Sequence, residues 1–340
     1  MTAGLTTRML RADAAAIHAA ARLLSDGGLV AFPTETVYGL GADATNGAAV
    51  AKLYAAKGRP SFNPLIAHVQ DLAAASFLAC FNDAAERLAR TFWPGPLTLV
   101  LARAPACPVA SLATAGLDSI AVRVPAHPIA RALLAAVGHP IVAPSANRSG
   151  HVSPTTAEHV VTDLAGRIDL VLDGGATAVG LESTIVACLG RPVLLRPGGL
   201  ARADIERALC QPLVEVSRSA EQTNNEDAPV APGMLTSHYA PHTQLRLDVD
   251  EVRRGEALLA FGPALPKGAT QALAFENLSA RSDLVEAAAN LFSHLRTLDA
   301  AGAAAIAVMP VPREGLGEAI NDRLTRAAAP RRTGRAGSHR

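Results

Sequence analysis

Hydrophobic and polar positions alternate along the first part of the chain between amphipathic segments and short apolar runs. From Ala12 an alanine-rich amphipathic segment stops at the Gly27-Gly28 pair, and the apolar run Leu29 to Pro33 follows directly. Glycine at the end of such a segment is typical of a helix C-terminus. The pattern therefore predicts a helix followed at once by a buried strand.

The same alternation continues to about residue 200. Short, partly β-branched apolar runs are typical of buried strands, and they predict strands at Pro64 to Val69, Leu97 to Ala102, Ser119 to Val124, Pro140 to Ala143, Ile168 to Leu172, Ser183 to Ala187 and Pro192 to Leu195. Helices are expected at 127–137 and 155–165. Alternating helices and strands indicate an α/β domain.

Polar residues mark where several helices should begin. Asn46 is placed to cap a helix that runs to Lys57, and Asp71 and Asn82 are placed as further N-caps. Thr155 and Glu158 have the spacing of a capping box, in which each side chain accepts a backbone hydrogen bond at the helix start.

Periodicity disappears between Gln211 and Thr243, where Ser, Thr, Asn, Glu and Pro accumulate, which predicts a linker or an active-site lid at 212–243. Beyond it, the pattern predicts strands at Ala257 to Phe261, Gln271 to Phe275 and Ala303 to Val308 and helices at Ser282 to Ala300 and Gly315 to Ala329. These elements fit a small βαβ domain at 244–340, after a larger domain at 1–211.

Composition supports a two-domain globular protein. The 340 residues exceed what one hydrophobic core usually supports, and the 49% hydrophobic content, mostly alanine, excludes a disordered chain. No apolar run approaches the roughly 18 residues of a spanning helix, and the N-terminus does not resemble a secretory signal. The four cysteines form no C-x-x-C pair, which is typical of a reducing compartment. We therefore expect a cytoplasmic protein.

The charges exclude an overall electrostatic surface for nucleic acid. The 31 basic and 30 acidic residues leave a net charge of +1, so any RNA contact must be local. Lysine occurs only at positions 52, 57 and 267, which makes each one worth inspecting. The arginine-rich tail at 331–340 is typical of a frayed, solvated end.

Two common nucleotide motifs are absent. Gly39 to Ala44 resembles a shortened dinucleotide fingerprint, but no acidic residue follows between Asp43 and Asp71 to bind a ribose, so we reject NAD binding there. No G-x-x-x-x-G-K-[ST] sequence is present either. A bound nucleotide would need a different loop.

A cationic segment at a helix-to-strand junction offers such a loop. Lys57 to Leu65 contains two cations and an amide, together with glycine and proline residues that allow close backbone approach, which suits a phosphate chain. The alternative is a solvated helix C-terminus at which the cations complement the helix dipole.

Hydroxyl side chains recur where apolar strands end or begin. Pro33 to Gly39 and Pro144 to Gly150 each follow a strand, and Leu181 to Thr184 precedes one. Ligand crevices of α/β proteins lie at such strand ends. The alternative for the first segment is a turn with threonine caps.

A buried arginine and three histidines are further candidate ligand residues. Arg123 lies in the apolar run from Ser119 to Pro125, where an arginine needs an anion, either an internal carboxylate or the carboxylate of a ligand. His68 lies at the end of another strand.

His238 and His242 have the spacing of a metal pair, but Pro241 interrupts the helix that this requires, so a zinc site has little weight.

Taken together, the motifs resemble the threonylcarbamoyl-AMP synthase family, with its YrdC-like fold, in the longer two-domain form. The residues that carry the resemblance are Pro33 to Gly41, Lys57 to Leu65, Trp93 to Thr98, Ala121 to Pro125, Pro144 to Gly150, Ser183 to Ile185, Arg196 to Gly198, Pro232 to Met234, His238 to Pro241 and Gly315 to Ile320. The resemblance implies an N-terminal YrdC-like α/β domain with a twisted mixed sheet and a smaller C-terminal Rossmann-like α/β domain.

The resemblance also implies a reaction and a ligand set. L-threonine, bicarbonate and ATP would give threonylcarbamoyl-AMP, pyrophosphate and water, with Mg²⁺ on the triphosphate and the product passed on for threonylcarbamoyladenosine (t6A) modification of tRNA. By resemblance, the ATP-binding residues are Lys57, Arg59, Asn63, Ser119, Ser145, Ser153, Arg196 and Tyr239, with Lys57 and Arg59 also catalytic. The threonine-binding residues are Thr36, His68, Arg123, Ser183 and, through its backbone, Ala143. It implies no particular metal ligands, and Glu35 and Asn147 match motifs without an assigned role.

Two other functions are alternatives for a chain of this fold. A carbamoyltransferase module of the hydrogenase-maturation type shares the YrdC-like fold, but it carries cysteine-rich zinc fingers and an acylphosphatase segment, which this chain lacks. An RNA-binding module would use a basic concave surface of the YrdC-like fold, and the near-neutral charge of the chain argues against that function.

Overall fold

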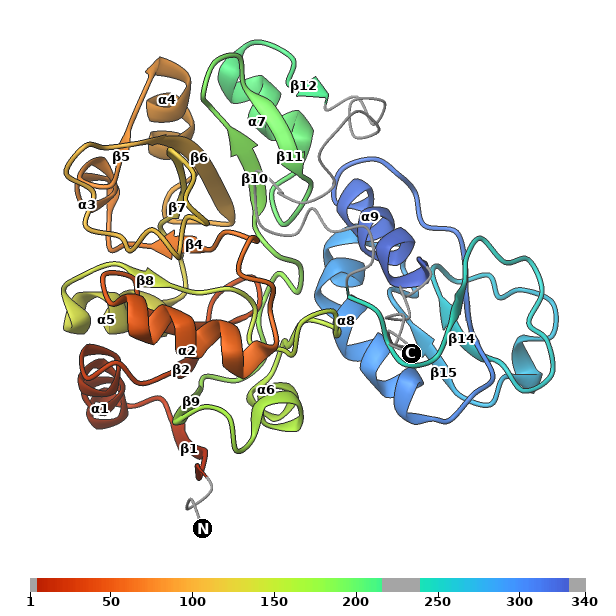
Figure 1. Ribbon diagram of the computed structural model, residues 1–340. Coiled ribbons are helices and arrows are strands. Elements are labelled where there is room, and N and C mark those ends of the chain that lie inside the picture. The colour runs from red at the N-terminus through yellow and green to blue at the C-terminus, as the bar shows by residue number, and fades with distance from the viewer. Residues whose placement is uncertain (1–4, 216–238, 330–340) are drawn as a thin grey trace, which may run out of the picture.

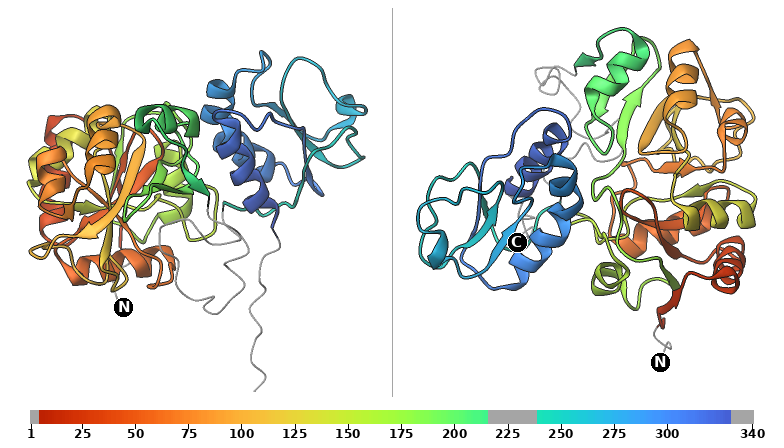
Figure 2. Two further views of the ribbon diagram at one scale, coloured as in Figure 1. Left: turned by 90° about the horizontal axis from the view of Figure 1, so that it is seen from above. Right: turned by 180° about the vertical axis from the view of Figure 1, so that it is seen from behind.

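The computed structural model describes residues 5–215 and 239–329, which form two α/β domains side by side (Figure 1). The larger domain carries the N-terminal part of the chain and the smaller one the C-terminal part. Turned views show the two domains as separate bodies joined along one side (Figure 2). In these residues no helix is long and apolar enough to cross a membrane.

The larger domain is built on a 12-stranded mixed sheet. Its strands are β1 (Arg8–Arg11), β2 (Val30–Pro33), β3 (Tyr38–Asp43), β4 (Ile66–His68), β5 (Ala79–Cys80), β6 (Leu97–Arg103), β7 (Ser119–Arg123), β8 (Ile141–Val142), β9 (Leu170–Asp173), β10 (Thr184–Ala187), β11 (Val193–Arg196) and β12 (Val214–Glu215). Its helices are α1 (Ala14–Ser25), α2 (Gly47–Lys57), α3 (Leu72–Ser76), α4 (Asp83–Phe92), α5 (Pro128–Val137), α6 (Ala157–Leu164) and α7 (Arg202–Leu209). The predicted mixed α/β fold is therefore confirmed.

The strand order brings distant segments together. It runs β1-β9-β2-β3-β8-β4-β7-β6-β10-β11-β12, with β5 paired to β6. In the middle, β4 runs parallel to β7 and antiparallel to β8. The register places His68 directly beside Arg123, so the two residues singled out in the sequence share one edge of the sheet.

Helix starts follow the capping residues, with one correction. Asn46 accepts hydrogen bonds from two backbone N–H groups of α2, which ends at Gly58 in the left-handed conformation, with φ of 62°. The capping box from Thr155 to Glu158 is wrong by one residue. Thr156 is the N-cap of α6 and accepts from the backbone N–H of His159, because the helix begins at Ala157.

The glycine-rich segment after β2 is a strand, β3, rather than a loop. A Cβ atom on Gly41 would lie 2.9 Å from the Phe32 ring and 3.1 Å from the Val30 carbonyl oxygen. The glycine therefore allows close packing between β3 and β2, which is consistent with the rejection of a dinucleotide loop.

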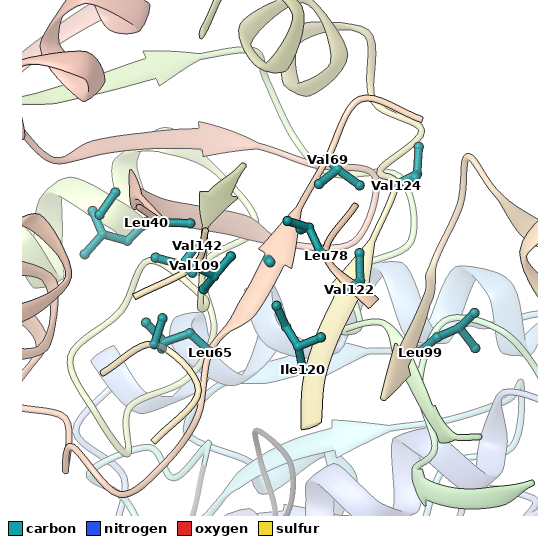
Figure 3. Close-up of a cluster of buried hydrophobic side chains, with 14 of the residues drawn as sticks. Leu40, Leu65, Val69, Leu78, Leu99, Val109, Ile120, Val122, Val124 and Val142 are labelled. Atoms are coloured by element: carbon teal, nitrogen blue, oxygen red, sulfur yellow. The ribbon is translucent and has the colours of Figure 1, made fainter. Parts of the chain in front are cut away.

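The main core lies under the central strands. Figure 3 shows aliphatic side chains from neighbouring strands packed against one another, among them Leu40 of β3, Val142 of β8, Val122 of β7 and Leu99 of β6. All four are fully buried. Such a close-packed layer holds the strand ends above it in fixed positions.

The smaller domain has a four-stranded parallel sheet. Its strands are β13 (Leu245–Arg246), β14 (Ala257–Ala260), β15 (Phe275–Asn277) and β16 (Ile306–Val308), and its helices are α8 (Leu284–Ala300) and α9 (Gly317–Ala328). The order is β13-β16-β14-β15, with every pair parallel. The strand expected at 271–275 begins only at Phe275, because a 3₁₀ turn at Ala269–Gln271 precedes it.

Helices α8 and α9 lie on the side of the small sheet that faces the larger domain (Figures 1 and 2). Val37, Val152 and Leu181 of the larger domain belong to the same buried apolar cluster as Leu291 and Phe292 of α8. The two domains therefore share a hydrophobic core across their interface.

Candidate active site

One pocket gathers most of the predicted residues, close to the domain interface. It encloses about 510 Å³ of empty space, part of it open to solvent. Its lining comprises Thr36, Val37, Arg59, Leu65, Ile66, His68, Arg123, Ala143, Pro144, Ser145, Glu182, Ser183, Arg196 and Tyr239. It therefore combines both predicted ligand sets in a single cavity.

Arg123 is buried at the end of β7 and has an internal anionic partner. Its Nη2 donates to Glu35 Oε1 at 2.6 Å, and its Nε donates to the Gly95 carbonyl oxygen at 3.2 Å. Within the described residues its Nη1 has no protein partner. The internal carboxylate considered from the sequence is thus present, and the guanidinium still faces the pocket.

Burial and the charge of Arg123 together set the pKa values of Glu35 and His68. Burial alone would raise the pKa of Glu35, but the charge and hydrogen bond of Arg123 lower it overall. Burial, aided by the nearby Arg123 cation, lowers the pKa of His68 from 6.5 to about 3. His68 is therefore a neutral imidazole near pH 7, able to donate or accept a hydrogen bond but not to neutralise an anion.

The hydroxyl segment after β2 forms a compact turn. Thr34 Oγ1 donates to the Val37 carbonyl oxygen at 2.7 Å and accepts from the backbone N–H of Thr36. The side chain of Thr36 is fully buried and hydrogen-bonded to that of Thr34 at 2.8 Å. The threonine-capped turn considered as an alternative is thus present, and it carries Thr36 to the pocket wall.

Ser183 lies between two strands and a buried cation. Its Oγ is 2.7 Å from Thr98 Oγ1 of β6. Arg196, at the end of β11, donates from Nη2 to the Ser183 carbonyl oxygen at 2.8 Å and to Ser183 Oγ at 3.3 Å. The threonine set and the nucleotide set are therefore in direct contact at this point.

The cationic segment at the end of α2 is folded inward rather than solvated. Lys57 is 3% exposed, and its Nζ donates to the backbone carbonyls of Ser145, at 2.5 Å, and Asn147. Burial, together with the nearby Arg59 cation, lowers its pKa well below the ordinary value. Arg59 lines the pocket and donates to the carbonyl oxygens of Asn63 and Pro64.

Asn63 is fully buried, and neither its amide nitrogen nor its amide oxygen has a hydrogen-bond partner among the described residues. A buried amide without partners costs free energy of folding, on the order of 1–3 kcal/mol. Such a group, next to Arg59 and Leu65 of the pocket, is typical of a position that a ligand completes.

The remaining nucleotide residues lie in different settings. Ser153 is fully buried and donates to Glu182 Oε1 at 2.5 Å. Tyr239 is 1% exposed, lines the pocket and stacks on Phe292 of α8 with ring centroids 5.7 Å apart. Ser119 is half-buried at the start of β7 and does not line the pocket. His238 and most of the 212–243 segment lie outside the described residues.

Sequence reasoning missed two charged residues at the site, Glu182 and Arg323, and gave no role to a third, Glu35. Glu182 lies beside a predicted ligand residue, in a hydroxyl-rich segment at a strand boundary, and that position was its only signal. Arg323 of α9 contacts Glu182. Its signal was an arginine on the apolar face of a helix, between Ile320 and Leu324.

Within residues 5–215 and 239–329, no group of three His, Cys, Asp or Glu side chains is arranged to hold a metal ion. The pocket's own carboxylate, Glu182, is already engaged by Ser153 and Arg323. The pocket thus offers cations and hydroxyls for an anionic ligand.

Comparisons with known proteins agree with this arrangement. A Sua5/YciO/YrdC family model described as "Telomere recombination" matches residues 22–198, and a model described as "Threonylcarbamoyl-AMP synthase, C-terminal domain" matches residues 200–329. The threonylcarbamoyl-AMP synthases of Bacillus subtilis and Pyrococcus abyssi are each 42% identical, covering 93% of this chain and 93% and 94% of theirs. The crystal structure of P. abyssi Sua5 complexed with L-threonine superimposes with a TM-score of 0.83 at 39% identity, covering 95% of this chain and 97% of that one.

Both domains match, and the matches extend over nearly the whole length of chain and relatives alike. The predicted resemblance is confirmed in its long, two-domain form. The chain belongs to the threonylcarbamoyl-AMP synthase (Sua5/YrdC) family.

Proposed function

We propose that this chain is an L-threonylcarbamoyl-AMP synthase, which converts L-threonine, bicarbonate and ATP into threonylcarbamoyl-AMP, pyrophosphate and water. One observation supports the proposal: a single pocket is lined by Arg123 at one end and by Arg59 and Arg196 at the other, which suits a ligand carrying both a carboxylate and a phosphate chain. Similarity to synthases of this name over 93% of the chain supports it.

In the proposed reaction, the threonine amine and bicarbonate condense to a carbamate with loss of water. A carbamate oxygen then attacks the α-phosphorus of ATP, the bond between the α-phosphorus and the bridging oxygen breaks, and pyrophosphate leaves. No enzyme nucleophile is needed, so positioning and charge neutralisation are the contributions asked of the protein.

The threonine end of the pocket would use Arg123 for the carboxylate. Its Nη1, which has no partner among the described residues, is the available donor, while Glu35 holds the other side of the guanidinium. Thr36, neutral His68 and Ser183 would hydrogen-bond the polar groups of threonine, with the backbone of Ala143 close by.

The nucleotide end would use fixed cations. Arg59 and Arg196 line the pocket, and Lys57 is held one layer behind it by the loop that carries Ser145. A bound triphosphate would supply an anion to Lys57 and Arg59, which have no ion pair among the described residues, and would add to the Glu182 charge near Arg196. Asn63, Ser145, Ser153 and Tyr239 would add hydrogen bonds and a ring surface, and Ser119 would lie at the edge.

Magnesium would enter as part of the MgATP substrate. Mg²⁺ keeps several waters and is commonly bound through phosphate oxygens. Since the described pocket residues offer no free carboxylate cluster, we assign no protein ligand and no separate step to the ion.

The product would serve t6A modification of tRNA in the cytoplasm, through a separate transfer machinery. All four cysteines are free thiols, which is consistent with a reducing compartment. No direct tRNA contact is assigned, because the near-neutral chain has no overall basic surface.

Pyrophosphate release from ATP tests the function. We expect release that requires both L-threonine and bicarbonate, and a product that contains label from both substrates. Equal release without threonine would contradict the proposal. Tight RNA binding without any pyrophosphate release would favour the RNA-binding alternative.

A further inference from the structure

The C-terminal domain sends one arginine into the wall of the pocket. Arg323 of α9 is fully buried, and its Nε donates to Glu182 Oε2 at 2.8 Å. Its Nη2 donates to the Pro197 carbonyl oxygen at 3.0 Å. Both acceptors belong to the larger domain, so the planar guanidinium bridges the interface with two hydrogen bonds of fixed direction.

Glu182 transmits this contact to the nucleotide end of the pocket. It lines the cavity, and its second oxygen accepts the hydroxyl of Ser153, a predicted nucleotide ligand. Burial alone would raise the pKa of Glu182, but the charges of Arg323 and Arg196 lower it overall. Glu182 is therefore an anion hydrogen-bonded to Arg323 and close to the charge of Arg196, and each of its oxygens has a hydrogen-bond partner.

Arg323 also contacts the aromatic residue of the site. Its Cζ lies 5.0 Å from the centroid of the Tyr239 ring, within the range of a cation–π interaction. Tyr239 has φ of 64°, a left-handed conformation that is strained for a bulky residue. The stack on Phe292 and the hydrogen bond from Ala240 N–H to the Gly150 carbonyl oxygen help to hold it there.

We propose that Arg323 is a positioning residue through which the C-terminal domain takes part in the reaction: by holding Glu182 and Tyr239 together, it aligns Ser153 and the tyrosine ring for the nucleotide. This inference rests on the proposed function for its ligand. It gives the small domain a role in ATP binding, although that domain contributes no lining residue of its own within the part of the chain described after Tyr239.

A second ion pair across the same interface provides the matched control. Arg202 of α7 donates to Glu318 of α9 at 2.5 Å, with both side chains about a quarter exposed. Neither residue lines the pocket. Loss of this pair weakens the contact between domains without touching Glu182 or Tyr239.

The experiment compares Arg323→Gln, Arg323→Lys and Arg202→Gln in the full chain. The readouts are KM for ATP and for threonine, binding of α,β-methylene-ATP by calorimetry, and thermal unfolding. We expect Arg323→Gln to raise KM for ATP and Kd for the analogue about tenfold or more, with KM for threonine within about threefold. Arg323→Lys keeps the charge but not the fork, so it should recover only part of the loss. Arg202→Gln should leave all three constants within about twofold.

A paired substitution keeps the test valid if Arg323→Gln fails to fold. Glu182→Met with Arg323→Met removes the buried pair together, while Asp322 keeps Arg326 as a partner and Arg196 keeps its hydrogen bonds to Ser183, so the fold should persist. We expect its loss of ATP-analogue affinity to be smaller than the sum of the losses in Glu182→Met and Arg323→Gln, because the two residues share one contact. A fully additive loss, or equal loss of ATP and threonine binding, would overturn the proposal. Calorimetry with the analogue needs no turnover, so it separates this result from a failure of the proposed reaction.

Discussion

Two arginine–carboxylate ion pairs with the same N···O distance show how the pocket differs from the small domain. Arg123 binds Glu35 at 2.6 Å in the pocket, and Arg246 binds Glu256 at 2.6 Å in the small domain. Arg246 directs both Nε and Nη2 to the same carboxylate, and Nη2 also donates to the Glu251 carbonyl oxygen. Arg123 gives only one nitrogen to its carboxylate, and its Nη1 has no protein partner in the described structure.

Two asparagines show the same difference. In the small domain Asn277 donates to the Gly262 carbonyl oxygen and accepts from Ser279 N–H. At the pocket both amide atoms of Asn63 are without partners in the described part of the chain. Polar groups that complete one another inside the fold contribute to stability, whereas groups left incomplete lower stability and are available to a ligand.

The largest expected effect is the difference between substituting Arg123 and substituting Arg246. Arg123→Ala should lower kcat/KM for threonine about 100-fold or more, because a buried charged hydrogen bond is worth about 3–5 kcal/mol when one partner is removed. KM for ATP should stay within about threefold. Arg246→Ala leaves a carboxylate unpaired in the same way, but it should lower only the melting temperature.

Steady-state kinetics with each substrate varied, beside thermal unfolding of both variants, checks this prediction. If Arg123→Ala weakened ATP and threonine equally, Arg123 would be a structural residue like Arg246. If Arg246→Ala lowered kcat/KM as strongly, the contrast between the two regions would not hold.

Local sequence patterns predicted the strands whose own residues form an apolar run. Strands such as β6 and β7 are continuous apolar runs, and they appear where the pattern indicated. The edge strand β1 is largely exposed and carries no apolar pattern. Strand β3 contains two glycines and was not predicted as a strand, and it pairs closely with β2 and β8.

The site residues, too, could be predicted where a local pattern marks them and not where they depend on a distant contact. Hydroxyls and cations at strand ends could be predicted, because strand ends of α/β sheets converge on one crevice. The contact of Glu182 with Arg323 joins residues 141 positions apart across two domains. It depends on how α9 docks, which no local pattern encodes, so the contact of the small domain with the pocket wall became visible only in the structure.

A smaller effect should appear in the pH dependence of stability. The pKa of His68 is about 3 when folded and 6.5 ordinarily. Below pH 6.5 the unfolded chain therefore binds a proton that the folded chain does not, and stability falls as pH decreases. This one group contributes about 1.4 kcal/mol per pH unit between those values.

His68→Gln should flatten that slope, as measured by urea unfolding between pH 7 and pH 4.5. His294 of the small domain also has a lowered pKa, because burial outweighs the opposing effect of the nearby Glu276. It is the matched control, and His294→Gln should flatten the slope less. An unchanged slope in His68→Gln would show that His68 is protonated in the folded state.

The smallest expected effect, and the most direct test of the contrast, comes from the two asparagines. Asn63→Leu replaces an unpartnered buried amide with an apolar group of similar size, so the free energy of unfolding should stay constant or rise by about 1 kcal/mol. Over the same substitution KM for ATP should rise about tenfold. Asn277→Leu breaks two hydrogen bonds, so it should cost about 1–3 kcal/mol of stability with KM for ATP within about twofold. A loss of stability in Asn63→Leu equal to that in Asn277→Leu would mean that the Asn63 amide supports the fold rather than the ligand.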